Sequence, residues 1–96
     1  MSHSLAWETT ETTLHFTGTL DRDSLMAFWD KRNSLLDHIE SIDVSGLKHV
    51  DSTGLAMLVR LKGEFHAKGR SVNVIGISDN LKTLIELYGV QTAVLS

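Results

Sequence analysis

Apolar residues along this chain alternate between a spacing of two and a spacing of three or four, and this alternation constrains the fold more than any other feature. A spacing of two, as in Leu14 and Phe16, is typical of a strand with one buried face. A spacing of three or four, as in Leu25 and Phe28, is typical of a helix with one apolar face. Strands that are joined through a helix pair in parallel. The pattern therefore predicts a fold of the α/β class.

Four segments are predicted strands, near residues 5–8, 14–18, 41–45 and 72–76. The first two can form an antiparallel hairpin that turns near 10–12. The last of the four has the continuous apolar composition of a buried strand. Residues 93–95 are expected to add a strand at the edge of the sheet.

Three segments are predicted helices: from Leu25 to about His38, from Ser52 to just before Gly69, and from about 78–80 to just before Gly89. In the second helix, Lys62 is expected to lie off the apolar stripe. The order is therefore strand, strand, helix, strand, helix, strand, helix. It predicts a small mixed sheet of about four strands covered by helices.

Length and charge exclude several classes of protein. The 96 residues, 1–96, are expected to form a single domain. With a net charge of -3 the chain is a poor candidate for binding nucleic acid. The N-terminus has neither the basic nor the apolar region of a secretory signal, and no apolar run approaches the roughly 18 residues of a membrane span. We therefore expect a cytoplasmic protein that does not itself cross a membrane.

The residue pattern also argues against catalysis and cofactors. The five histidines lack the spacing of zinc ligands and there is no cysteine, so no metal is expected. The glycines do not form a nucleotide-binding motif. His49, Asp51 and Ser52 are neighbours along one segment and lack the GxSxG elbow of a hydrolase. We expect a protein that is not an enzyme and needs no cofactor.

Asp51, Ser52, Thr53 and Gly54 stand directly before the apolar run of the second helix. In the simplest interpretation Asp51 is only an N-cap. In the functional interpretation Ser52 presents a hydroxyl at a helix start, where free N–H groups also suit a phosphate. Gly54 would let another backbone, or a partner, approach closely.

Trp29 lies at the edge of the first helix's apolar stripe, and Arg32 follows one turn later. The tryptophan can either flank the core or anchor a protein interface, where Trp and Arg are enriched. Both alternatives fit the sequence.

Two motifs carry a family resemblance: a strand ending in IDVSGL, and VDSTGL at the start of an amphipathic helix. In this order of elements, which spans the whole chain, they resemble STAS domains, a family that includes the anti-sigma factor antagonists. The resemblance implies the STAS fold, a small mixed sheet with helices packed over one face. In the antagonists the hydroxyl directly after the acid is phosphorylated, which makes Ser52 a candidate phosphorylation site.

Other segments resemble the STAS subunits of ABC phospholipid transporters: SLAW at 4–7, GTLDRDSL at 18–25, Trp29 with Arg32, and LIELYGV at 84–90. This resemblance implies a non-catalytic subunit, peripheral to the inner membrane on its cytoplasmic side. It would bind and support the transporter's ATPase in a complex that holds two copies and maintains outer-membrane lipid asymmetry. The start of the second helix, with Ser52, would face the ATPase.

The alternative function is an anti-sigma factor antagonist that is switched by phosphorylation of Ser52. The transporter subunits often carry threonine where this chain has Ser52, and Asp-Ser-Thr-Gly is closer to the phosphorylated antagonists. Conversely, SLAW and Trp29 favour the transporter subunit, because the antagonists generally lack a tryptophan there. Both functions use the same surface and differ in the partner.

Overall fold

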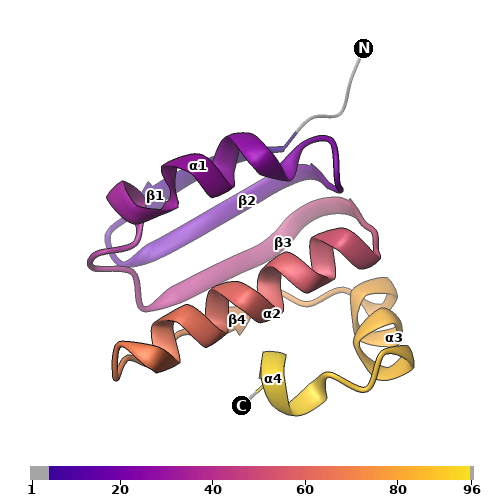
Figure 1. Ribbon diagram of the computed structural model, residues 1–96. Helices are drawn as coiled ribbons and strands as arrows, with labels where there is room; N and C mark the ends of the chain where they lie inside the picture. Colours follow the sequence, from indigo (N-terminus) through magenta and orange to yellow (C-terminus); the bar gives the residue numbers. More distant parts are fainter. Residues whose placement is uncertain (1–4, 96) are drawn as a thin grey trace.

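The computed structural model describes residues 5–95, which form a four-stranded sheet with helices over one face (Figure 1). Its elements are β1 (Ala6–Thr10), β2 (Thr13–Leu20), α1 (Leu25–Leu35), β3 (Ser41–Val50), α2 (Ser52–Ala67), β4 (Asn73–Ile75), α3 (Asp79–Leu87) and α4 (Gln91–Leu95). Residues 1–4 and 96, at the two ends of the predicted domain, lie outside the described residues.

The sheet has the strand order β1-β2-β3-β4 and is mixed. β1 and β2 form the predicted antiparallel hairpin, which turns at Glu11 with a positive φ of 55°. β2 pairs with β3, and β3 with β4, in parallel. The mixed sheet predicted from the sequence is therefore confirmed, including the parallel pairing of strands that are joined through helices.

The core lies between the sheet and the helices. Leu14 and Phe16 of β2 and Ile42 of β3 point toward the helical layer and are fully buried. Phe28 of α1 meets the Phe16 ring edge-to-face, with 4.8 Å between the ring centroids. In Figure 1, α1 lies in front of β1, and α2 passes in front of β4 and runs alongside β3, so that the start of α2 lies at one end of the sheet.

β3 is twice as long as the sequence predicts, because residues 46–50, expected as a loop, continue the strand. Their main chain pairs with the second half of β2, from Thr17 to Leu20. The pairing shifts register on either side of Thr17 and Gly18, and these irregularities hide the strand from a search for strict alternation. The strand consequently runs to the residue before Asp51.

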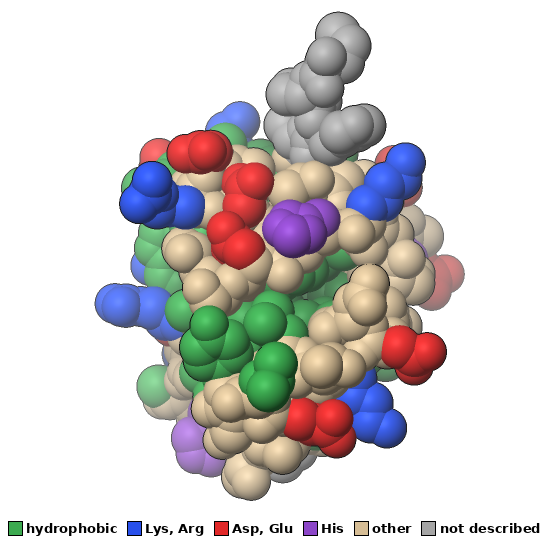
Figure 2. All heavy atoms as spheres, turned by 90° about the vertical axis from the view of Figure 1, so that its right-hand side faces the viewer, with side chains coloured by type: hydrophobic (Ala, Val, Ile, Leu, Met, Phe, Trp, Pro, Cys, Tyr) green, Lys and Arg blue, Asp and Glu red, His purple; other side chains and the backbone are tan. Residues whose placement is uncertain are grey.

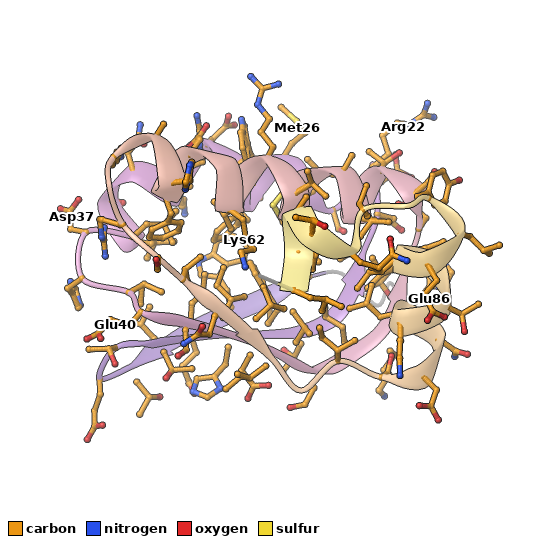
Figure 3. The ribbon with its side chains drawn as sticks, turned by 90° about the horizontal axis from the view of Figure 1, so that it is seen from below. Arg22, Met26, Asp37, Glu40, Lys62 and Glu86 are labelled. Atoms are coloured by element: carbon orange, nitrogen blue, oxygen red, sulfur yellow. The ribbon has the colours of Figure 1, made fainter. Side chains whose placement is uncertain are left out.

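The predicted edge strand at 93–95 is wrong, since these residues belong to the short helix α4. α4 packs across α2, and Val94 is fully buried between them. The ammonium group of Lys62 donates a 2.9 Å hydrogen bond to the Val94 carbonyl, and Figure 3 shows Lys62 pointing from α2 toward α4. Lys62, expected off the apolar stripe, is therefore buried, and this burial lowers its pKa.

Two other boundaries differ from the prediction. β4 covers only three residues and is an edge strand, so Val74 is half-buried and Ile75 is exposed rather than part of a buried strand. α1 ends at Leu35, short of His38. Just beyond the helix end, the guanidinium of Arg70 donates to the carbonyls of Leu36 and Ile39, both at 2.8 Å, and so supplies hydrogen bonds to carbonyls that the helix does not satisfy.

Candidate functional site

The start of α2 follows β3 with only one residue between them. β3 ends at Val50 and α2 begins at Ser52, so Asp51 alone makes the connection. The Asp51 carboxylate accepts a 2.8 Å hydrogen bond from the backbone N–H of Gly54, and the backbone N–H of Asp51 donates to the Leu20 carbonyl at 3.2 Å. Asp51 is therefore the N-cap that the sequence predicts, and it ties the helix to the end of β2.

Gly54 is buried on the inner side of this first turn. A Cβ atom at this position would lie 2.3 Å from the Leu20 carbonyl oxygen and 2.9 Å from the Leu20 Cγ. The expected close approach of another backbone to Gly54 does occur, but the approaching backbone is the chain's own β2. Gly54 therefore packs against the chain's own β2, and its assignment as a partner-binding residue stays a prediction.

Ser52, Ala56 and Arg60 form an exposed ridge along α2. Their spacing of four places successive side chains on the same side of the helix. Ser52 stands at the end of this ridge as the first residue of the helix. Thr53, directly after it, is half-buried and turns toward α1.

Shallow apolar depressions flank the ridge on both sides. The first, of about 310 Å³, lies between α2 and α1 and is lined by Leu25, Met26, Trp29, Thr53 and Met57. The second, of about 280 Å³, lies between α2 and the end of α3 and is lined by Leu55, Val59, Tyr88 and Val90. Ala56 and Arg60 line both depressions, and Ser52 lines the second. We refer to the ridge and its two depressions as the α2 face.

Two large apolar side chains of the α2 face remain unusually exposed: Met26 at 53% and Tyr88 at 57%. Figure 3 shows Met26 projecting outward from the helical layer. Exposed apolar side chains beside apolar depressions are typical of a protein interaction site. Neither Met26 nor Tyr88 is among the site residues predicted from the sequence, because their exposure depends on how α1 and α3 pack beside α2.

Trp29 is half-buried, flanks the core as one sequence-based alternative predicts, and also lines the α2 face; its role as an interface anchor stays a prediction. Arg32 lies beside it as predicted, with its guanidinium 3.8 Å from the ring centroid. The donors of Arg32 are engaged within the chain: it binds both carboxylate oxygens of Glu64, at 3.0 and 3.3 Å, and the Trp29 carbonyl at 2.8 Å. Arg32 is thus placed to hold the Trp29 ring in position, and its role as a partner-binding anchor stays a prediction.

A separate depression of about 230 Å³ lies at the end of the molecule where β3 passes into α2. Its lining combines apolar side chains of β3 and α3 with the polar side chains of Lys48, His49, Ser78 and Asn80. Figure 2 faces this end and shows hydrophobic side chains gathered at its centre. No residue predicted as a site lies in this depression.

On the second face of the sheet, the Nδ1 of His15 on β2 and the Oδ2 of Asp43 on β3 lie 2.9 Å apart and share a part-buried hydrogen bond. The backbone N–H of Ser45 donates to the other carboxylate oxygen at 2.9 Å. These bonds, that from Ser45 first, lower the pKa of Asp43.

Among residues 5–95, no group of three or more acidic, histidine or cysteine side chains is arranged to hold a metal ion. Within that same range, no helix has the length and apolar character of a membrane span.

Comparison with known proteins gives consistent matches over nearly the whole chain. The profile of a family described as "Mlab, STAS domain" matches residues 3–96. The chain is 38% identical, over 95 residues, to the intermembrane phospholipid transport system binding protein MlaB of Escherichia coli (strain K12), covering 99% of this chain and 98% of that protein. The same values apply to MlaB of Shigella flexneri. MlaB of Haemophilus influenzae is 32% identical over 83 residues, covering 80% and 79% of the two chains.

Proposed function

The chain belongs to the MlaB family of STAS domains, and on this premise we propose that it is a non-catalytic subunit of an intermembrane phospholipid transport system. In this proposal the whole chain is one STAS domain that binds and supports the ATPase of an ABC transporter. The α2 face makes the contact, with Ser52 at its tip. The complex holds two copies of the chain and keeps them at the cytoplasmic side of the inner membrane.

The observation that carries the proposal is the α2 face itself. An exposed hydroxyl stands at a capped helix start, and apolar depressions lie on both sides of the same helix. Trp, Tyr, Met and Arg, all present on this face, are the residue types enriched in protein interfaces. The face is also firmly positioned, because Asp51 ties the helix start to the end of β2. A rigid face loses little conformational entropy when it binds.

Ser52 provides the test. In the proposed complex its hydroxyl makes one neutral hydrogen bond, so Ser52→Ala should cost about 0.5–1.5 kcal/mol of binding free energy. Ser52→Thr keeps the hydroxyl and should bind almost as well as wild type. Ser52→Asp places a second carboxylate beside Asp51 and into a desolvated contact, where an unpaired charge costs several kcal/mol.

The measurement is the Kd for the purified transporter ATPase of the same organism, with folding of each variant checked by circular dichroism. Ser71, an exposed serine outside the α2 face, supplies the matched control. Ser71→Asp should leave the Kd unchanged. If Ser52→Asp binds as tightly as wild type, the contact does not include Ser52 and the proposal in this form is wrong.

The second candidate is the antagonist switched by phosphorylation, and one observation favours it. Ser52 is exposed and directly follows the helix cap Asp51, where a kinase can reach its hydroxyl. The intact mass of protein purified from native cells separates the two functions. A phosphorylated form that disappears in Ser52→Ala would support the antagonist, whereas co-purification of the ATPase with unmodified protein would support the transporter subunit.

A further inference from the structure

Arg60 lies at the end of the ridge opposite Ser52, on the α2 face. It is exposed, it lies two turns from Ser52 on the same ridge, and it lines both depressions. The other side chains that line these depressions are apolar or carry only a neutral hydroxyl. Arg60 is therefore the ionised group of the face, and it lies between two apolar surfaces.

The charge of Arg60 is not neutralised within residues 5–95. Glu64, one turn further along α2, is bound by Arg32 instead. The Arg60 guanidinium lies 5.9 Å from the centroid of Trp29, at the outer limit of a cation–π contact. No carboxylate of the described residues lies within ion-pair distance of it.

A partner that fills both depressions has to cover the ridge between them and thereby remove water from Arg60. An unpaired charge in such a contact is costly, whereas a carboxylate with two parallel hydrogen bonds compensates the guanidinium well. Resting on the proposed function, we infer that the ATPase surface which binds here carries an Asp or Glu flanked by apolar side chains on both sides. That carboxylate pairs with Arg60 while its apolar neighbours enter the two depressions.

A protein partner fits this face better than an anionic membrane. The depressions on both sides of Arg60 are apolar, and the chain as a whole carries a net charge of -3, which opposes approach to anionic lipid. One cation framed by apolar surface is the arrangement of a specific ion pair. A lipid-binding surface instead clusters several Lys or Arg residues.

The test compares Arg60→Gln and Arg60→Glu with wild type for binding to the purified ATPase at about 50 and 500 mM salt. Arg60→Gln should raise the Kd at least about tenfold and flatten its salt dependence, since the pair is lost. Arg60→Glu should raise the Kd about a hundredfold or more, because it sets like charges against each other. Lys82→Glu makes the same change of charge at an exposed site on α3, outside the α2 face, and should change the Kd less than about twofold.

A compensating variant makes the test decisive. Cross-linking first identifies an acidic residue of the ATPase that contacts the α2 face, and this residue is then changed to Arg. The changed ATPase should bind Arg60→Glu again and should bind the wild-type chain more weakly. If Arg60→Gln binds within about twofold of wild type with an unchanged salt dependence, the inference is overturned while the proposed function stands. If wild type itself does not bind the ATPase, the proposed function fails instead. If Arg60→Glu loses binding only to vesicles of anionic phospholipid, the inference is overturned in favour of a lipid surface.

Discussion

Replacing Gly54 by alanine should destabilise the protein, although alanine is the better helix former. The added Cβ would lie 2.3 Å from the carbonyl oxygen of Leu20 and 3.0 Å from its carbonyl carbon. Neither atom can rotate out of the way, because both belong to the main chain of a paired strand. The first turn of α2 must therefore move away from β2 by roughly 1 Å to reach normal contact distance.

The cost has two parts and one offset. Overpacking of this kind costs about 1–3 kcal/mol. The movement also stretches the 3.2 Å hydrogen bond from Asp51 to Leu20, whose loss costs about 1 kcal/mol. The higher helix propensity of alanine returns about 1 kcal/mol. We expect the free energy of unfolding of Gly54→Ala to fall by roughly 2 kcal/mol.

Urea denaturation followed by circular dichroism measures this change. For a domain of this size, roughly 2 kcal/mol corresponds to a midpoint about 1–2 M lower. Gly63 provides a matched control, since it is exposed on the same helix and a Cβ there would meet nothing within 4 Å. Gly63→Ala should therefore raise stability by up to about 1 kcal/mol. Opposite signs for one substitution at two sites of one helix identify the contact with Leu20 as the cause.

A Gly54→Ala midpoint equal to or above that of wild type would refute the reasoning. It would mean that α2 can move away from β2 at little cost, and that the position of Ser52 is not fixed by the end of β2.

Two more predictions concern Trp29 on helix α1 and Asp43 on strand β3. Trp29→Ala should lower the stability by about 1–2 kcal/mol, less than for a fully buried ring, and weaken ATPase binding by about 2 kcal/mol; an unchanged Kd would remove Trp29 from the interface. The pKa of Asp43 is lowered below its usual 3.8, so its ionised form stabilises the folded state above that pH, and this contribution is lost as the pH falls through the lowered value. Asp43→Asn should thus be less stable than wild type at neutral pH. Urea titrations should show that the difference in free energy of unfolding between the two proteins shrinks as the pH is lowered. A difference that does not change with pH would contradict the stabilising role of the ionised Asp43.

The sequence was sufficient to predict the parts of the fold that depend on local signals. Asp51 before an apolar run predicts a capped helix, and the cap bond to Gly54 is present. Gly69 and Gly89 end their helices with the positive φ values of 72° and 64° that favour glycine. The resemblance to STAS domains, read from IDVSGL and VDSTGL, is confirmed by the family match over residues 3–96.

The remaining features depend on contacts between segments far apart in the chain. Lys62 follows the pattern of a surface residue and is buried only because α4, 32 residues later, folds over it. The sequence predicts a close approach at Gly54 but not that Leu20 makes it. Arg60 is one of several charged residues along α2, and its position between two depressions becomes visible only when α1 and α3 are placed beside it.

The one-residue connection between β3 and α2 also makes the α2 face sensitive to changes in chain length. A loop would absorb an inserted residue, but here the strand ladder runs to Val50 and the helix begins at Ser52. One extra residue after Asp51 would turn the rest of the helix by about 100° relative to its cap, since an α-helix has about 3.6 residues per turn. If the helix start kept its place, the apolar stripe of α2 would rotate out of the core. If the stripe kept its place, Asp51 and Ser52 would be displaced from the ridge. Relatives that use the same face should therefore tolerate substitutions around this junction and exclude insertions and deletions within it.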